Sequence, residues 1–226
     1  MLIPALNEAE ALPAVLEALP VDSLHTVVVV DNGSTDATGE VARALGARVV
    51  VENERGYGVA CLAGLALLRE LSPPPEVIVF MDADHPEDAG RIGVLLDALG
   101  EGVDLVLGTR VDERGDTGNL HVHARWGNRL VLSTVRLLWW RGFHDLAPFR
   151  AMRFASLEKL DMDDRNWGWT LQMQLRALSE GMRIVEVRVP HRPRALGRSK
   201  ISGSFNTSVR VGCKMFYTIV RERLRR

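Results

Sequence analysis

The sequence predicts a single α/β domain with a mostly parallel central sheet and helices on both of its faces. Short apolar runs rich in β-branched residues alternate with longer helix-like runs over the first hundred residues, an order that is typical of βα units. Glycine and proline stand between many of these runs, where connections are expected. The 226 residues suffice to bury one large core, and no repeat or low-complexity stretch indicates a second domain.

The first half of the chain justifies this fold element by element. Each strand-like run is followed by a helix-like run, and Gly46 and the prolines at 73–75 mark two of the helix ends. The expected strands are Leu2–Pro4, Thr26–Asp31, Ala47–Val51, Val77–Met81 and Asp104–Gly108, and the expected helices are 9–19, 37–45, 57–70 and 87–99.

The second half of the chain has a looser pattern. A polar loop from about 111 to 123 precedes an expected helix at about 124–140, and a short segment then runs through Phe149. A helix at about 167–180, a strand at Arg183–Val189, a basic loop at 190–204 and a final helix complete the expected order.

The charges are unevenly distributed although the net charge is only −1. Acidic residues dominate up to about Asp104, whereas arginine and lysine dominate the tail after about Arg188. A basic tail is typical of proteins that bind phosphates or an anionic membrane. Nucleic acid is not expected, because the tail has few aromatic residues and no recognisable binding module.

Neither the cysteines nor the apolar runs indicate a secreted or membrane-spanning protein. Cys61 and Cys213 lie far apart without a partner at ligand spacing, which favours reduced thiols and a cytoplasmic protein. No apolar run approaches the roughly 20 residues that span a bilayer. The nearest approach, Leu130–Trp140, is short and interrupted by polar residues.

The most informative motif is an apolar strand that ends in two carboxylates, Asp82 and Asp84. Side chains two residues apart on an extended segment point the same way. Two neighbouring carboxylates repel each other, and a hard divalent cation that also binds a phosphate of the substrate removes that repulsion. The following residues, Asp84 to Glu87, also fit a helix-capping box, and the two roles are compatible.

Polar groups also follow the first and second expected strands. They should meet Asp82 and Asp84 at one edge of the sheet, where α/β proteins bind nucleotides. A dinucleotide fingerprint and a Walker loop are both absent, because the first turn lacks the glycines that these motifs require. Taken singly, Asp36 also suits a helix cap and Asn32-Gly33 a turn. The groups are Asn7 and Glu8 after the first strand and Asp31-Asn32-Gly33-Ser34-Thr35-Asp36 after the second.

These motifs, with four others, resemble the family 2 glycosyltransferases and specifically their dolichyl-phosphate-mannosyltransferase-like branch. The order and spacing match over nearly the whole chain. The resemblance implies a GT-A fold, a nucleotide-diphosphate-sugar donor, UDP- or GDP-linked, a Mg²⁺ or Mn²⁺ ion, and inversion at the anomeric carbon. The further motifs are Gly56-Tyr57-Gly58-Val59-Ala60, Gly108-Thr109-Arg110, Asp145-Leu146-Ala147-Pro148-Phe149-Arg150 and Ser199-Lys200.

The same resemblance implies a site in two halves, with the donor bound by residues 1–111 and the acceptor by residues 112–226. Asp82 and Asp84 would hold the metal and the diphosphate, and Asp145 would orient the sugar or the acceptor. The implied donor-binding residues are Pro4, Ala5, Asn7, Glu8, Asp31, Gly33, Ser34, Asp36, Gly56, Gly58, Asp82, Ala83, Asp84 and Lys200; the implied acceptor-binding residues are Arg110, Arg129, Ser133, Arg150 and Ser199.

Two positions depart from the pattern of the family. Pro86 stands where many relatives have a glutamine near the ion, which leaves only His85 nearby. Gln172 stands where relatives usually have glutamate, and an amide cannot act as a general base at neutral pH. Either Gln172 is structural or the reaction needs no base there, as is the case for an acceptor phosphate that is already an anion.

We therefore expect a metal-dependent enzyme that transfers a sugar to a polyprenyl- or dolichyl-phosphate lipid. Three alternatives stay open: an enzyme with a hydroxyl acceptor and Asp145 as base, a weakly active nucleotide-sugar-binding subunit of a membrane complex, and a nucleotidyltransferase. The last is the least supported, because this sequence lacks the glycine-rich first loop that is expected of a nucleotidyltransferase.

The final helix bears on where the protein works. Its basic face, Arg210, Lys214, Arg221 and Arg225, either contacts the inner face of the cell membrane or leaves the apolar side of that helix to close the core. A homodimer is a further open expectation.

Overall fold

The computed structural model describes residues 1–226 except 21–22, 85–88, 111–121, 147, 190–204 and 226. For residues 122–126 and 205–209 it describes the helix backbone but not the side chains. One seven-stranded sheet runs through it in the order β3-β2-β1-β4-β6-β5-β7. All neighbours pair in parallel except β6, which is antiparallel to β4 and β5. The strands are β1 Leu2–Ala5, β2 Val28–Asp31, β3 Arg48–Val51, β4 Val77–Phe80, β5 Leu105–Thr109, β6 Arg150–Arg153 and β7 Ile184–Arg188.

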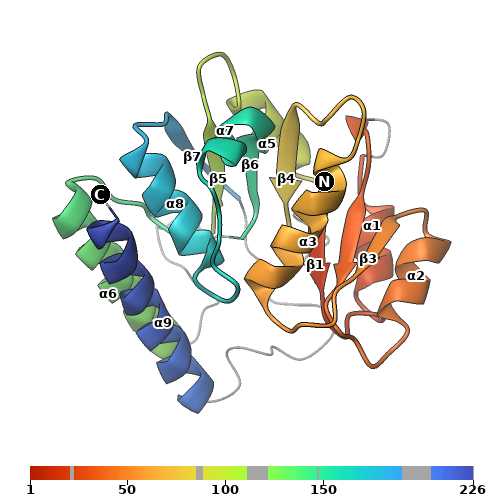
Figure 1. Ribbon diagram of the computed structural model, residues 1–226, viewed down its shortest axis with the longest axis horizontal. Helices are drawn as coiled ribbons and strands as arrows, with labels where there is room; N and C mark the ends of the chain where they lie inside the picture. Colours follow the sequence, from red (N-terminus) through yellow and green to blue (C-terminus); the bar gives the residue numbers. More distant parts are fainter. Residues whose placement is uncertain (21–22, 85–88, 111–121, 147, 190–204, 226) are drawn as a thin grey trace.

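Helices cover both faces of this sheet, so the expected α/β fold is confirmed (Figure 1). Successive residues of one strand enter opposite cores: Leu2 packs on one face and Ile3 on the other, and Val28 and Val29 divide in the same way. Strands that are buried on both faces explain the continuous apolar runs of the sequence. The described helices are α1 Leu12–Glu17, α2 Thr38–Ala44, α3 Tyr57–Arg69, α5 Ile92–Ala98, α6 Val122–Trp139, α7 Phe154–Lys159, α8 Trp169–Ser179 and α9 Phe205–Leu224.

Two elements were not expected from the sequence, β6 and the short helix α7 that follows it directly. The strand Arg150-Ala151-Met152-Arg153 carries a charge at each end, so no apolar period marks it. It nevertheless lies in the middle of the sheet, where Arg150 pairs with Phe80 and Leu107. Tertiary packing, rather than local pattern, makes this segment a strand.

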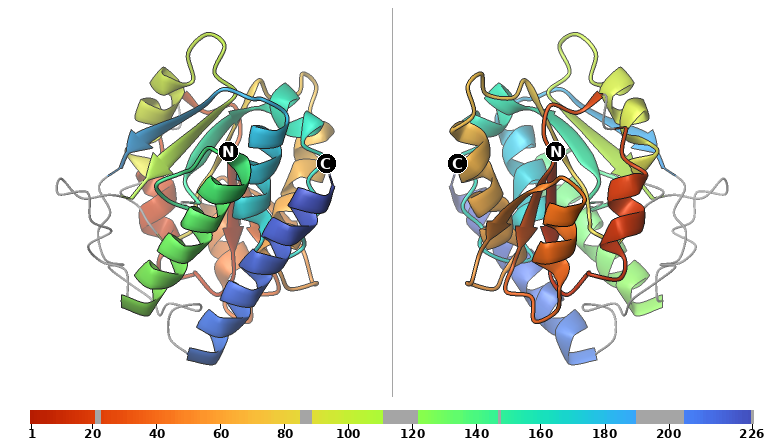
Figure 2. Two further views of the ribbon diagram at one scale, coloured as in Figure 1. Left: turned by 90° about the vertical axis from the view of Figure 1, so that its left-hand side faces the viewer. Right: turned by 90° about the vertical axis from the view of Figure 1, so that its right-hand side faces the viewer.

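The helices α6 and α9 lie side by side at one end of the molecule, outside α8 (Figures 1 and 2). Arg223 of α9 stacks over the indole of Trp139 in α6, with its guanidinium carbon 5.9 Å from the ring centroid. No helix in the described ranges combines the length and the apolar character that crossing a membrane requires.

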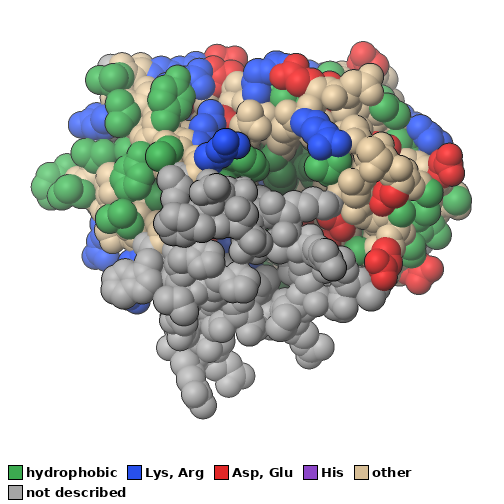
Figure 3. Space-filling model, turned by 90° about the horizontal axis from the view of Figure 1, so that it is seen from below, with side chains coloured by type: hydrophobic (Ala, Val, Ile, Leu, Met, Phe, Trp, Pro, Cys, Tyr) green, Lys and Arg blue, Asp and Glu red, His purple; other side chains and the backbone are tan. Residues whose placement is uncertain are grey.

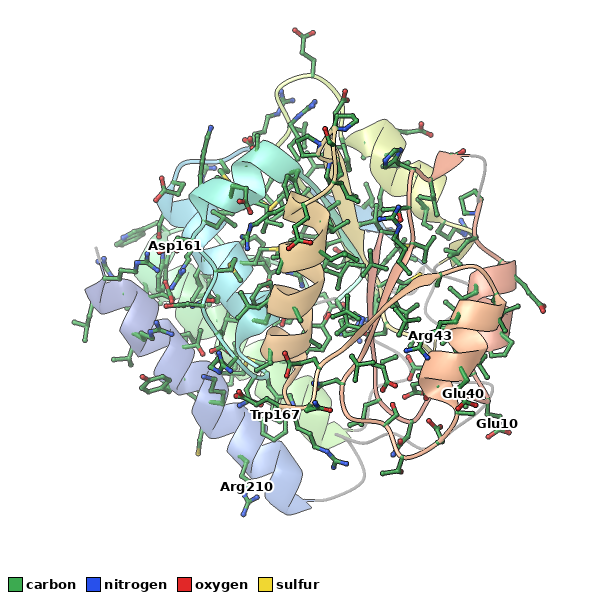
Figure 4. The ribbon with its side chains drawn as sticks, turned by 45° about the vertical axis from the view of Figure 1, so that its right-hand side comes forward. Glu10, Glu40, Arg43, Asp161, Trp167 and Arg210 are labelled. Carbon is green, nitrogen blue, oxygen red and sulfur yellow. The ribbon has the colours of Figure 1, made fainter. Side chains whose placement is uncertain are left out.

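The expected basic face of the final helix is largely paired within the chain. Lys214 contacts the buried carboxylate of Asp164 at 2.7 Å, Arg221 pairs with Asp163, and Arg225 contacts Asp161 at 2.8 Å. Figure 4 shows Asp161 beside the end of α9, whereas Arg210 points away from the body of the molecule. The basic residues Lys214, Arg221 and Arg225 therefore dock α9 onto residues 161–164.

Candidate active site

The loops that follow β1 and β2 are joined by reciprocal hydrogen bonds. The Asn7 N–H donates to the Ser34 hydroxyl at 2.9 Å, and the Thr35 N–H donates to the Asn7 side-chain oxygen at 2.7 Å. Asp31, at the end of β2, accepts from the Ser34 N–H at 3.0 Å. The two loops thus form one rigid rim at the carboxyl edge of the sheet, as the sequence predicts.

Asp36 belongs to the same rim. One of its oxygens accepts from the Ala9 N–H at 3.2 Å, and the other accepts from the Thr38 N–H at 3.0 Å and from the Thr38 hydroxyl. Partial desolvation raises the pKa of Asp36, but the hydrogen bonds from Thr38 and Ala9 hold it below its ordinary value. The Thr38 hydroxyl in turn accepts from the Glu8 N–H at 2.9 Å. Pro4 and Ala5 lie within β1, directly before the first loop of the rim.

Asn32 holds the third loop to the rim, a role that its place in an Asn-Gly turn concealed. Its buried amide donates to the Glu54 carbonyl at 2.6 Å and accepts from the Gly56 N–H at 2.8 Å. Gly33 follows with a φ of +74°, a conformation that favours glycine. Asn32 directly follows the apolar strand β2, and this position at a strand end is the sequence signal that points to it.

Gly56 and Gly58 have a packing role that the sequence did not reveal. A Cβ on Gly56 would lie 2.2 Å from the Arg165 carbonyl oxygen, and one on Gly58 would lie 1.8 Å from that of Asp164. The Val59 N–H donates to the Arg165 carbonyl at 3.1 Å. Because only glycine permits this approach, the start of α3 is pressed against residues 164–165.

Asp82, Ala83 and Asp84 follow β4 at the centre of the same edge. Asp84 is 4% exposed and Asp82 is partly exposed. Among the described residues, no group of three or more His, Cys, Asp or Glu side chains is placed to hold a metal ion. Two carboxylates supply hard oxygen ligands, and a Mg²⁺ or Mn²⁺ ion normally completes its shell with substrate phosphate and water oxygens, so the donor set fits such an ion. His85 and Pro86 lie outside the described residues.

Arg150 lies in the interior of the protein instead of at its surface. Its guanidinium is 1% exposed and donates to the Thr170 carbonyl at 3.0 Å. Burial lowers the pKa of Arg150 to about 10, and the charges of Asp145 and Asp82 counter this effect. Tyr57 lies in the same cluster, where desolvation raises the pKa of its phenol. This buried position does not support the expected contact of Arg150 with an acceptor. Arg150 instead supplies a fixed positive charge near the site.

Arg110 and Asp145 form an ion pair at the end of β5. The Arg110 Nε donates to Oδ2 at 2.8 Å and Nη2 donates to Oδ1 at 3.1 Å, while the Arg110 N–H adds a bond of 3.1 Å. Asn128 of α6 and the Leu146 N–H also donate to Oδ1, at 3.3 and 2.8 Å. The side chain of Asp145 is therefore held in one orientation.

The protonation of Asp145 follows from this geometry. Burial alone raises the pKa of Asp145, but the charge of Arg110 and the hydrogen bonds hold it below its ordinary value. A buried carboxylate with a lowered pKa is a poor general base. Asp145 is thus placed to position Arg110. Asn128 and Gln174, which donates to the Asp145 carbonyl at 3.1 Å, are supporting residues that the sequence did not reveal.

The remaining acceptor candidates are less well connected. Arg129 and Ser133 are exposed one turn apart on α6, directly after Asn128. Ser199 and Lys200 lie outside the described residues. The structure therefore brings Arg110 and Asp145 together and sets Arg129 on the neighbouring helix.

Gln172 of α8 lies in a buried network between α8 and α9. Its oxygen accepts from the Asp164 N–H at 2.9 Å, and its amide nitrogen donates to Asp163 at 2.7 Å and to Glu222 at 2.8 Å. Glu222 also pairs with Arg176, with Nε 2.8 Å from Oε2, and both side chains are buried. These contacts give Gln172 a structural role.

With this geometry in place, comparison with known proteins decides the family. The model of glycosyl transferase family 2 matches residues 1–161, more than half of the chain. The chain belongs to glycosyltransferase family 2. The expected family and enzyme class are thereby confirmed, and the protein is a glycosyltransferase.

Individual family 2 relatives extend the match beyond residue 161. An uncharacterised glycosyltransferase of Mycobacterium tuberculosis is 39% identical over 215 residues, which cover 92% of each protein. The polyprenol monophosphomannose synthase of Mycolicibacterium smegmatis is 37% identical over 226 residues, covering 90% of this chain and 81% of the relative. The name of the second of these relatives states a polyprenol phosphate product.

A solved structure shares the fold. The glucosyl-3-phosphoglycerate synthase of M. tuberculosis, in complex with Mn²⁺, UDP-glucose and phosphoglyceric acid, superposes with a TM-score of 0.75 and 21% identity over 98% of this chain and 78% of that one. The expected GT-A fold is confirmed by this likeness.

Proposed function

We propose that this family 2 enzyme transfers a sugar from a UDP- or GDP-sugar to the phosphate of a polyprenyl-type lipid, with inversion. The observation that carries the proposal is the Arg110–Asp145 pair at the same sheet edge as Asp82 and Asp84. A guanidinium held by a buried carboxylate is preorganised to bind an anionic group. The name of the 37% identical polyprenol monophosphomannose synthase supports a lipid phosphate as that group.

The donor would lie along the rim formed by the first half of the chain. Asn7, Asp31 and Asp36 are held by hydrogen bonds, so the nucleoside would meet groups that need little reorganisation. When bound to Asp82 and Asp84, a Mg²⁺ or Mn²⁺ ion would neutralise charge on the departing diphosphate. The proposed donor-binding residues are those that the family resemblance implies, with Gly56 and Gly58 shaping the rim and Lys200 as a further cation.

The acceptor would lie between Arg110 and the start of α6, in the second half of the chain. Arg110 would position the phosphate, with Arg129, Ser133 and Ser199 as further contacts. A phosphate monoester, whose second pKa is about 6, is already largely ionised at neutral pH and needs orientation, not deprotonation. This agrees with the lowered pKa of Asp145, whereas a hydroxyl acceptor would need a stronger base.

The test combines donor binding with two matched acceptors. Thermal melts with UDP or GDP should show stabilisation that requires Mn²⁺ or Mg²⁺, because a ligand that binds only the native state raises its stability. Transfer from the identified donor to a polyprenyl phosphate should proceed, and transfer to the corresponding polyprenol should not. Equal transfer to the alcohol would overturn the assignment of the acceptor.

The metal assignment has its own variant and control. Asp84→Ala should abolish turnover and the metal-dependent stabilisation, whereas Asp97→Ala, an exposed carboxylate on α5, should leave both unchanged. Turnover of Asp84→Ala at the wild-type rate in excess EDTA would exclude a metal site there.

A further inference from the structure

The two outer strands of the sheet, β3 and β7, differ in how they are protected against pairing. No further strand of the described chain pairs along the outer side of either one. Glu186 stands at the middle of β7, where it accepts from the His144 N–H at 2.9 Å. A charge in the middle of an edge strand discourages pairing with another sheet. The strand β3 reads Arg-Val-Val-Val, so no charge interrupts its valines and its edge lacks that protection.

The backbone of β3 presents hydrogen-bonding groups at its outer edge at alternate residues. The two N–H groups that flank the valines, those of Arg48 and Glu52, each donate at 2.9 Å to a carbonyl on the β2 side. Because this direction alternates along a strand that pairs in parallel, Val50 also faces β2. Val49 and Val51 therefore direct their N–H and C=O groups outward, where another strand could pair with them.

The segment from Arg48 to Glu52 is complementary to itself when two copies run antiparallel. With Val50 opposite its own counterpart, Arg48 lies opposite Glu52 of the second copy, and the same contact repeats at the other end. Val49 then lies opposite Val51, and both of these residues face outward, so they exchange N–H···O bonds. The arginine and the glutamate fall in non-hydrogen-bonded pairs, in which side chains lie closest. The charges and the backbone thus require the same register independently.

We propose that β3 pairs antiparallel with β3 of a second copy, centred on Val50, so that the two sheets join into one. An isologous interface brings identical patches together, and this patch carries an arginine and a glutamate that match each other across the twofold axis. Val51 is 56% exposed, and Val49 of the second copy would cover it. The open expectation of a homodimer thereby acquires a defined surface.

The surroundings of β3 suit a second copy of the same chain. Figure 1 shows β3 at the outer side of the sheet beside α2, and the right-hand view of Figure 2 looks at this end. Acidic and basic side chains both lie at the right of Figure 3, the end of the molecule that β3 and α2 form. A surface of one sign would repel its own copy, whereas charges of both signs permit the contact.

Pairing along β3 would leave the carboxyl edge of the sheet open to substrates. β3 ends at Val51, and the rim begins beyond it, where the Asn32 amide donates to the Glu52 carbonyl at 3.2 Å. The interface would run along the side of the sheet and border the rim without covering it. The pairing goes beyond the proposed function and does not depend on the identity of donor or acceptor.

Charge variants of the full chain test the register by sedimentation velocity over a range of concentrations. The wild type should form dimers. Arg48→Glu and Glu52→Arg each place like charges opposite each other at both ends, so each should weaken self-association about tenfold or more. An equimolar mixture of the two variants should associate again, because the two acids of one chain then lie opposite the two bases of the other. Arg183→Glu, an exposed arginine directly before the other outer strand, should associate like the wild type.

A proline variant tests the backbone pairing without changing a charge. Val51→Pro removes an N–H that faces outward, so it removes no bond within the sheet of one copy but removes one bond from each copy across the interface. It should weaken association about tenfold or more.

A cysteine variant tests the centre of the register. In a Cys213→Ser background, which removes the exposed thiol, Val50→Cys should form a disulfide between two copies on mild oxidation. Val49→Cys should not, because its counterpart in the second copy is not opposite to it.

Three results would overturn the proposal. They are a wild type that stays monomeric at every concentration, a dimer that Arg48→Glu and Val51→Pro leave intact, and charge variants whose mixture does not associate. Self-association that each charge variant loses and their mixture regains supports the pairing, because variants that had failed to fold would not regain it. Donor-dependent melts test the proposed function separately, since the dimer requires neither donor nor metal.

Discussion

The amide nitrogen of Gln172 donates to the Glu222 carboxylate at 2.8 Å, and this bond joins α8 to α9 in a buried network. Gln172 also donates to Asp163 and accepts from the Asp163 and Asp164 N–H groups. The position requires a side chain that donates and accepts at once, which an amide does and a carboxylate does not.

Gln172→Glu should therefore destabilise the fold without creating a catalyst. The new carboxylate would lose two donated bonds and face Asp163 and Glu222, at an expected cost of about 2–4 kcal/mol. Urea unfolding measures this loss. The rate per folded molecule should change less than about tenfold, or roughly 1.4 kcal/mol of barrier.

A paired variant provides the control for Gln172→Glu. Adding Glu222→Gln relieves the repulsion, so the double variant should be more stable than the sum of the two single changes by at least about 0.5 kcal/mol. A gain in rate of several orders of magnitude in Gln172→Glu would instead show that the chain had lost a base at this position.

Gly58→Ala should be strongly destabilising, since its Cβ would lie 1.8 Å from the Asp164 carbonyl oxygen, which is backbone and cannot turn aside. We expect a loss of about 3 kcal/mol in the free energy of unfolding. Gly93→Ala in α5 is the matched control, because nothing lies within 4 Å of its added Cβ. That change should be neutral or stabilise by about 0.5–1 kcal/mol. Similar urea midpoints for the two variants would refute the close packing at Gly58.

The sequence predicted the fold and the rim of the site because both depend on local signals. Apolar runs mark β1, β2 and β4, and the polar residues after them must meet at one edge once the strands are parallel. The strand β6 could not be predicted, because a buried arginine such as Arg150 is stabilised by distant partners and leaves no local pattern.

The role of the basic final helix depends on distant residues in the same way. Lys214, Arg221 and Arg225 form an amphipathic pattern that fits a membrane contact or a docking face equally well. Only the fold shows that the 161–164 segment supplies their partners.

Arg110→Lys should weaken binding of the phosphate acceptor while leaving the donor unaffected. A lysine cannot reproduce the two-bond contact with Asp145, so its charge would no longer be held in place. We expect KM for a polyprenyl phosphate to rise about tenfold, which corresponds to about 1.4 kcal/mol, with KM for the nucleotide sugar unchanged. Arg69→Lys is the control, because Arg69 makes a comparable contact with Glu158 on the surface. An equal rise in both KM values for Arg110→Lys would place Arg110 in the donor site instead.

Asp145→Asn should destabilise the protein at neutral pH and lose that effect in acid. Because the pKa of the buried carboxyl is lower in the folded protein than its unfolded value of about 3.9, its contribution is fully present above that value and is lost as the pH falls through the folded pKa. At pH 7 we expect Asp145→Asn to lower the free energy of unfolding by about 2 kcal/mol. The difference from the wild type should shrink as the pH falls below about 4, and it should vanish only below the folded pKa of Asp145, where that carboxyl is neutral in the folded protein as well. Urea unfolding at pH 7, 5, 4 and 3 measures it. Asp161→Asn, which removes an exposed pair with Arg225, should cost less than about 1 kcal/mol at pH 7. A deficit for Asp145→Asn that stays constant from pH 7 to pH 3 would mean that the pair with Arg110 does not depend on the charge of Asp145.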